Sequence, residues 1–455
     1  MRGALFALLL AAPLLAAPRS RAEPIPLARG LPRPEGIGKL VIVTNYAGHD
    51  RRLKAVKVLA EYRGSKIFKF KGGRIGSVRK ALAAQGAEFV ALAVKPETVD
   101  TNFHYEVLEL CRDLDRDPMP DFHFGYLCAR DGADLERMVD RIIGREKRPP
   151  EPPVAKVVSL SGSGKHLEGL DYFMHFGHGQ AWCVVKGLSG EQVGKLHLPR
   201  APVVFSGACF NGVLSRSFHK CAYQLVFWKP TTIDPKHLMT LNWVHAGATG
   251  LLAALEGDRG EMAMAEWDYF RERACALGEV IGYQYRLAFT SVYADFTKFP
   301  RHNPGQRKKM SFYNVMLRGM VSRLLLSDPA YRPLRKPLDA PYHRVDVKTD
   351  EARLTVTIVV DRYAQGQHLN YLPKSGRGVF DMRIYNRVAV PAGVRLLAEP
   401  EVTVRNGFGI VVLTRHHVRH EVWGGKRYLN LQVEAPSGSF KRGTRATYVF
   451  PLEKR

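Results

Sequence analysis

The sequence predicts an α/β protein followed by a smaller all-β module, and three observations lead to this prediction. Apolar strand-like runs alternate with segments of helical periodicity between about residues 38 and 335. A proline-rich stretch at residues 148–153 divides this region in two. After about residue 336 the pattern changes to short strand-like segments separated by Gly and Pro turns. Strands that alternate with helices are typical of a mostly parallel sheet, and closely spaced short strands are typical of a β-sandwich.

The first half of the α/β region covers residues 38–150. Gly64 and Gly86 each follow a helical pattern and predict where that helix stops. We expect strands at 39–44, 66–70, 89–94 and 122–128, and helices at 53–62, 77–85, 105–114 and 131–143.

The second half covers residues 151–335 and repeats the alternation. We expect strands at 154–160, 172–176, 203–206 and 246–254, and helices at 261–276, 279–291 and 312–325. In the third region, residues 336–455, we expect a β-sandwich with strands at 354–360, 379–385, 402–405, 411–415, 429–433 and 447–450.

The N-terminus has the pattern of a secretory signal peptide over residues 1–22. Arg2 supplies a positive start, and the apolar run at 5–17 is too short for a helix to cross a bilayer core of about 30 Å. Ala22 ends a small-residue cleavage site, and residues 23–37 form a proline-rich leader. We therefore expect an exported protein, periplasmic or extracellular, without a transmembrane segment.

The chain is basic, with 68 Lys and Arg against 43 Asp and Glu and a net charge of +25. This charge favours contact with polyanions. It is spread along the chain without a basic block or a recognition motif, so dedicated nucleic-acid binding is not expected. The six cysteines show neither CxxC nor zinc-ligand spacing, and we expect no full disulfide framework.

The segment that carries chemistry is residues 172–212. One predicted strand leads to His178 and Gly179, and the next leads to Cys209. Adjacent parallel strands bring the residues at their carboxyl ends to one edge of the sheet, where α/β proteins form their sites. Histidine is the natural base to convert a thiol to a thiolate near neutral pH. The N–H groups of Gly179 and Cys209 could then form an oxyanion hole.

The residues alone therefore suggest acyl transfer by a Cys–His pair. A plain structural interpretation stays open, because a cysteine at a strand end is usually a small buried hydrophobe. A histidine at a strand end is usually a hydrogen-bonded polar group.

The two motifs, Gly177-His178-Gly179 and Ala208-Cys209, together resemble the gingipain family of cysteine peptidases in the caspase-like superfamily. Further stretches resemble the same family: 120–125 with 134–142, 246–250, and 325–330, where Ser327 replaces a family glycine. The resemblance covers about residues 38–335.

This resemblance implies a caspase- and gingipain-like parallel-sheet catalytic domain in two subdomains, followed by an Ig-like β-sandwich. It implies that Cys209 is the nucleophile, that His178 carries protons, and that peptide bonds are hydrolysed through a thioester. The chain between Asp140 and His178 is shorter than in the gingipains, and their acidic specificity residues have no counterpart here. Arg specificity is therefore not carried over. No cofactor is expected; the resemblance allows calcium but assigns no calcium site.

Other candidates have simpler interpretations. Glu256 and Asp258 follow a predicted strand and could select a basic substrate residue, or form a turn that caps the next helix. His175 and His178 could hold a metal only if a turn separated them, because residues three apart on a strand face opposite sides. The segment 162–166 departs from a phosphate-binding loop, and His416 and His420 fit a solvated strand.

The sequence thus predicts an exported cysteine endopeptidase that acts on protein or peptide substrates. The alternative is a catalytically inactive scaffold of the same fold that binds partners through its basic surface.

Overall fold

The computed structural model describes residues 38–70, 74–222, 225–257, 260–290, 307–309, 319–362, 380–412, 414–436 and 439–453. The predicted signal peptide and leader lie outside these residues. In the described part of the chain, no helix has the length and apolar character needed to cross a membrane.

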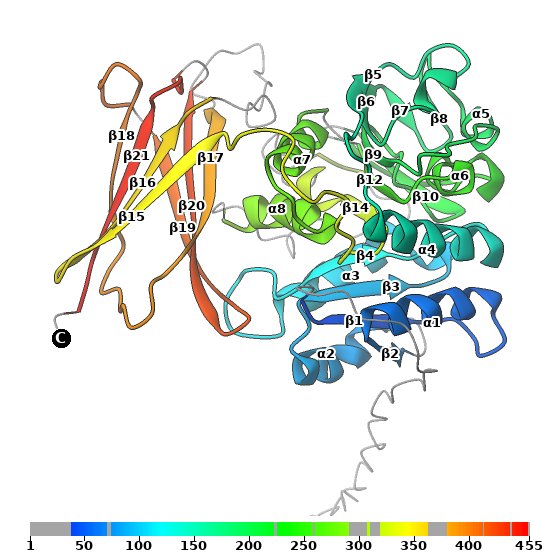
Figure 1. Cartoon of the computed structure of the whole chain (residues 1–455), viewed down its shortest axis with the longest axis horizontal. Helices are drawn as coiled ribbons and strands as arrows, with labels where there is room; N and C mark the ends of the chain where they lie inside the picture. The colour runs from blue at the N-terminus through cyan, green and yellow to red at the C-terminus, as the bar shows by residue number, and fades with distance from the viewer. Residues whose placement is uncertain are drawn as a thin grey trace, which may run out of the picture.

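The first half of the α/β region forms four parallel strands with helices between them, as predicted (Figure 1). Gly64 and Gly86 end α1 and α2 with φ angles of 62° and 56°, a left-handed conformation that suits glycine. The predicted helix stops are therefore confirmed. The strands are β1 (Leu40–Thr44), β2 (Lys66–Lys69), β3 (Phe89–Ala93) and β4 (His123–Tyr126); the helices are α1 (Arg51–Arg63), α2 (Arg79–Gln85), α3 (Thr101–Arg112) and α4 (Gly132–Lys147).

The second half adds five strands to the same sheet and four helices. The strands are β5 (Ala155–Val158), β6 (Tyr172–Gly177), β9 (Val203–Ala208), β12 (Gly250–Ala254) and β14 (Arg323–Leu326); the helices are α5 (Gly190–Gly194), α6 (Met239–Ala246), α7 (Gly260–Glu272) and α8 (Leu277–Thr290). Two hairpins project from this half, β7 (Gly179–Gln180) with β8 (Cys183–Val184), and β10 (Ser217–Ala222) with β11 (Leu225–Thr232), which also pairs with β13 (Arg307–Lys309).

The two halves share one nine-stranded sheet in the order β2-β1-β3-β4-β14-β12-β9-β6-β5. Strand β14 joins them, because it pairs in parallel with β4 and antiparallel with β12. Figure 1 shows α1, α4 and α6 along one face of the sheet and α7 and α8 on the other. The proline-rich stretch at 148–153 thus separates two segments of chain that complete a single sheet.

Two sequence predictions fail within this region. The helix expected at 312–325 is wrong at its end, because residues 323–326 form the buried strand β14. A short apolar run has the same pattern in a buried strand and in a buried helix. The strand expected at 246–254 begins only at Gly250, because Ala246 ends α6.

The C-terminal region is a sandwich of two antiparallel sheets, as predicted (Figure 1). Side chains from both sheets form one core, and β16 alternates between buried and exposed positions as a strand with one solvated face should. One sheet has the order β15-β16-β21-β18 and the other β17-β20-β19. Their bounds are β15 (His343–Thr349), β16 (Arg353–Val360), β17 (Phe380–Ala389), β18 (Glu401–Arg405), β19 (Arg415–Trp423), β20 (Lys426–Pro436) and β21 (Arg445–Pro451).

Two details of the sandwich differ from the sequence prediction. Strand β15 was not predicted, and its exposed side chains explain why no apolar pattern marks it. The strand expected at 411–415 is wrong in position, because β19 begins at Arg415 and Val411 makes only an isolated bridge with Arg405.

A buried carboxylate joins the sandwich to the α/β region. Glu421 of β19 accepts hydrogen bonds from Arg286 of α8 at 2.9 and 3.0 Å and from Arg387 of β17 at 2.8 and 2.9 Å. Asn430 donates a further bond to it at 2.9 Å, and both guanidinium groups lie over the ring of Trp423. Because Glu421 is almost fully buried, this cluster fixes the sandwich against α8.

Candidate active site

His178 and Cys209 follow neighbouring strands at the same edge of the sheet. Strands β6 and β9 pair in parallel, and Gly177, the last residue of β6, lies opposite Ala208, the last residue of β9. His178 and Cys209 are the next residue of each strand, and paired strands lie about 4.8 Å apart. His178 is exposed and Cys209 is partly exposed, whereas Ala208 and the strands beneath are buried. The predicted pair is therefore brought together where solvent can reach it.

The turn after Cys209 is held in an unusual conformation. Phe210 has a φ of 61°, which is uncommon for a residue other than glycine. Its N–H donates to the carbonyl of Glu256 at 3.0 Å, and the N–H of Gly212 donates to Ala254 at 2.8 Å. The end of β12 therefore fixes the backbone on which Cys209 sits. Such fixed, strained turns are concentrated at functional sites.

Asn211 links this turn to the hairpin that follows His178. Its side-chain oxygen accepts from the Ser206 hydroxyl at 3.1 Å, and its side-chain nitrogen donates to the Gln180 carbonyl at 2.8 Å. Thr240 in turn donates to the Asn211 carbonyl at 2.7 Å. This positioning role was not predicted from the sequence. The signal available was only the place of Asn211, two residues after the cysteine.

Gly179 lies directly against the backbone of Cys209. A Cβ atom on Gly179 would meet the Cys209 carbonyl oxygen at 2.3 Å and the Cys209 nitrogen at 2.8 Å. The N–H of Val185 donates to the His178 carbonyl at 2.7 Å, so in the alternating antiparallel pattern the next pair, Gly179 and Val184, is not hydrogen-bonded. The Gly179 N–H therefore points away from β8 and is not used within the hairpin.

His175, in strand β6, is a buried and uncharged residue. Both ring nitrogens of His175 lack a hydrogen-bond partner, and the side chain has no exposed surface. Burial, with a smaller contribution from Arg323, lowers the pKa of His175 to about 3. His175 is thus a neutral core residue, whereas His178 is exposed. Among the described residues, no cluster of three metal-ligating side chains occurs.

The other candidate positions are placed as follows. Glu256 follows β12, is 1% exposed, and lies 3.4 Å from the hydroxyl of Tyr105. Asp258 lies outside the described residues, and the pair's role in substrate selection stays a prediction. His416 and His420 are both exposed on β19, in keeping with a solvated strand.

The thiols differ sharply in their access to solvent. The described cysteines at positions 111, 128, 183, 209 and 275 form no disulfide bonds. Burial raises the pKa of Cys111, Cys128 and Cys275 well above the ordinary range of a thiol. Cys183 is partly exposed, and burial raises its pKa as well. Cys209 is also partly exposed, and it follows the strand that pairs with the one leading to His178.

His178 makes no hydrogen bond or ion pair with a carboxylate in the described part of the chain. This agrees with the shortened segment before His178 noted in the sequence.

A groove of about 450 Å³ opens at the tip of the β7–β8 hairpin. It is lined by Trp182, Ser189, Glu191, Thr232, Ile233 and His237. Within the groove, His237 Nδ1 lies 2.9 Å from a carboxylate oxygen of Glu191. Trp182 lies at the tip of the β7–β8 hairpin, and the lining of the groove does not include His178, Gly179 or Cys209.

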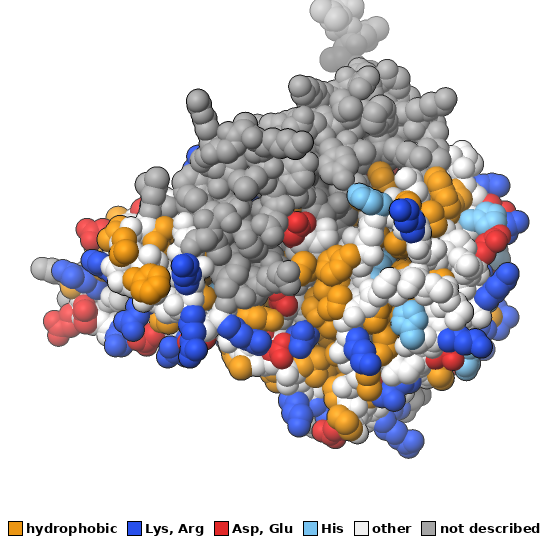
Figure 2. Space-filling model, turned by 90° about the horizontal axis from the view of Figure 1, so that it is seen from above, with side chains coloured by type: hydrophobic (Ala, Val, Ile, Leu, Met, Phe, Trp, Pro, Cys, Tyr) orange, Lys and Arg blue, Asp and Glu red, His pale blue; other side chains and the backbone are white. Residues whose placement is uncertain are grey.

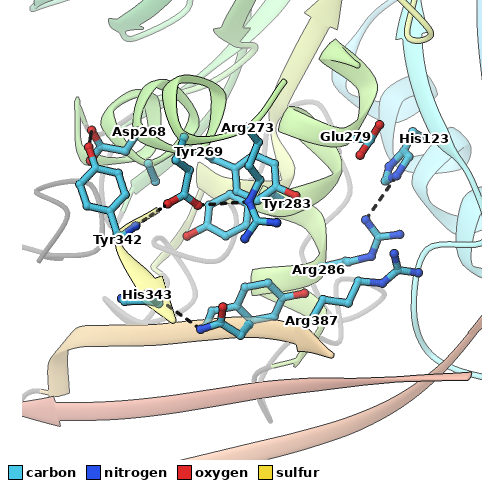
Figure 3. A pocket seen from close by; sticks show the side chains of 14 residues that line it. His123, Asp268, Tyr269, Arg273, Glu279, Tyr283, Arg286, Tyr342, His343 and Arg387 are labelled. Carbon is cyan, nitrogen blue, oxygen red and sulfur yellow. Dashed lines mark hydrogen bonds and ion pairs between the residues drawn. The ribbon is translucent and has the colours of Figure 1, made fainter. Parts of the chain in front are cut away.

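A second cavity, of about 70 Å³, lies between α7, α8 and the sandwich, as Figure 3 shows. Its polar groups are bonded to one another: Tyr342 donates to Asp268 at 3.1 Å, and Arg273 donates to Glu272 at 3.1 Å. At its other end, Arg286 lies 3.4 Å from His123. This cavity belongs to the contact between the two domains and contains neither His178 nor Cys209.

No protein-family model and no curated protein matches the chain. Among solved structures, it is similar to one described as "Structure of Protease", with 9% identity, a TM-score of 0.45, and coverage of 90% of this chain and 94% of the other. It is also similar to the Arg-specific cysteine proteinase gingipain R (RGPB), with 11% identity, a TM-score of 0.42 and coverage of 90% and 96%. A complex of Porphyromonas gingivalis RgpB pro- and mature domains gives the same identity and TM-score, with coverage of 90% and 99%.

Proposed function

We propose that this protein is a cysteine-type endopeptidase in which Cys209 and His178 hydrolyse peptide bonds. The observation that carries the proposal is the register of β6 and β9, which sets these two residues side by side at the carboxyl edge of the sheet. The close packing of Gly179 on the Cys209 backbone supports it, because an oxyanion hole formed by these two residues requires their backbones to lie close together.

In the proposed reaction, His178 accepts the proton of the Cys209 thiol, and the sulfur attacks the scissile carbonyl carbon. The N–H groups of Gly179 and Cys209 hold the resulting oxyanion. The intermediate then collapses as the carbon–nitrogen bond breaks, and His178 gives its proton to the leaving amine. Water, deprotonated by His178, hydrolyses the thioester and restores the thiol. General acid–base catalysis of this kind contributes about 10²–10⁴ in rate, and one oxyanion donor about 10²–10³.

We propose that the groove at Trp182 binds a substrate side chain next to the scissile bond. Its carboxylate, Glu191, already contacts His237 at 2.9 Å, so we propose that the groove takes an uncharged side chain. We also propose that the protein is exported after cleavage behind Ala22, which N-terminal sequencing of the mature chain tests.

The experiment is digestion of a mixed peptide library, with the products identified by mass spectrometry. We expect cleavage by the natural protein and none by Cys209→Ala or His178→Ala. Cys183→Ala is the matched control, because Cys183 is also partly exposed and lies outside the proposed dyad. Cleavage that survives in Cys209→Ala contradicts the mechanism. A folded natural protein that cleaves nothing supports the inactive scaffold instead.

A further inference from the structure

The sandwich carries three large apolar side chains at the tip of one turn. Phe408 is 75% exposed, Ile410 62% and Val411 61%. These three residues, called the Phe408 tip below, follow β18 at the end of the sandwich where β21 begins. Exposed apolar side chains that occur singly are ordinary, but three together at a tip mark an interaction surface.

The Phe408 tip is a preformed turn. The side-chain oxygen of Asn406 accepts from the N–H groups of Phe408 and Ile410, each at 3.0 Å, and the Asn406 N–H donates to the Ile410 carbonyl at 2.8 Å. Gly409 adopts a φ of 81°, as such a turn requires. The backbone of the turn is held by its own hydrogen bonds, so the apolar side chains stay exposed. Binding would therefore cost less conformational entropy than it would for a flexible loop.

Basic side chains surround the Phe408 tip. Arg405 and Arg445 lie opposite each other on β18 and β21, and Lys441 lies 5.5 Å from the ring of Phe408. With Arg442 they make four exposed cations, called the basic collar below. The acidic side chain of Asp361 interacts electrostatically with Arg442, but it accepts a hydrogen bond from Arg344 at 2.9 Å. In Figure 2 the sandwich lies at the left, and its hydrophobic side chains are seen among Lys and Arg as well as Asp and Glu side chains.

We propose that the Phe408 tip and the basic collar form a docking surface for anionic lipid bilayers. Apolar side chains next to cations match the two layers of such a surface, because the cations meet the anionic headgroups while the apolar groups enter the acyl boundary. A nucleic acid or an acidic polysaccharide would use the collar alone and leave the tip exposed to water. The surface holds the proposed active site near a membrane but takes no part in it, so it stands whether or not Cys209 is catalytic.

The test is co-sedimentation of the full chain with phosphatidylcholine vesicles, with and without phosphatidylglycerol. We expect binding only to the anionic vesicles, weakened by salt. Replacing the tip by Phe408→Ser, Ile410→Ser and Val411→Ser should lower the partition coefficient at least about tenfold. Each of Lys441→Gln and Arg442→Gln should lower it about fivefold.

The matched control is Leu397→Ser. Leu397 is 58% exposed but is bonded to Pro451 at the opposite end of β21, so its replacement should leave binding unchanged. The proposal is overturned if anionic vesicles do not bind, or if the tip variant binds as the natural protein does. It is also overturned if the tip substitutions abolish self-association and leave vesicle binding intact, because the surface then joins two copies of the chain.

Discussion

Gly179→Ala offers the sharpest structural test of the proposed oxyanion hole. The added Cβ would lie 2.3 Å from the Cys209 carbonyl oxygen, whereas ordinary contacts begin at 3.4 Å. Both neighbours are backbone, so the Gly179 and Cys209 chains must separate by about 1 Å. A misplacement of about 1 Å can cost about 10²-fold in rate, and loss of one oxyanion donor costs about 10²–10³. We therefore expect the turnover number to fall by about 10²–10³.

The assay measures initial rates on a peptide that the natural protein cleaves, together with the thermal unfolding midpoint. Overpacking of this size costs about 1–3 kcal/mol, so the variant should still fold. Gly169→Ala is the matched control, because a Cβ at Gly169 meets no atom within 4 Å. A folded Gly179→Ala protein with the natural rate refutes the oxyanion assignment. Equal losses in both variants show that the effect is not specific to the site.

Three further predictions follow from buried charges and thiols. Glu421→Gln should lower the free energy of unfolding, measured by urea titration, by about 3–5 kcal/mol, because it leaves the buried Arg286 and the partly exposed Arg387 without their carboxylate. Glu453→Gln, at an exposed pair, should cost under about 1 kcal/mol, and equal effects would contradict the interdomain role. The pKa of His175 falls from 6.5 unfolded to about 3 folded, so the unfolded chain binds the proton first and stability falls as pH drops through this window. At pH 5 the contribution of His175 to this loss should be about 2 kcal/mol, measured by urea titration at several pH values. His175→Gln should lack this contribution but keep the part due to His104 and His123, whose pKa values burial also lowers. Of the cysteines at positions 111, 128, 183, 209 and 275, only Cys183 and Cys209 should react with iodoacetamide before unfolding, as read by peptide mass spectrometry; labelling of Cys111 in the folded protein would show that the core opens.

The sequence predicted the parts of the fold that local patterns determine. Continuous apolar runs identified β1, β3, β6 and β9, and Gly64 marked the end of α1. The placement of His178 beside Cys209 was predictable because the ends of neighbouring parallel strands share an edge.

The parts that were not predicted depend on tertiary contacts. Strand β14 is four residues long and buried on both faces, so no periodicity separates it from a helix, yet it unites the two halves of the sheet. The role of Asn211 depends on the Gln180 carbonyl, 31 residues away, which only the folded chain brings within reach. The Glu421 cluster joins residues of α8, β17 and β19, and no local sequence signal marks it.

The most direct test of the central claim is the rate at which Cys209 reacts with iodoacetamide at about pH 6, with Cys183 as the internal reference. A thiolate stabilised by a neighbouring imidazolium reacts at pH values below the ordinary pKa of a thiol. The account predicts that Cys209 reacts much faster than Cys183, and that His178→Ala removes the difference while the protein stays folded. Equal rates for the two thiols, or a fast Cys209 in His178→Ala, would contradict the Cys–His dyad.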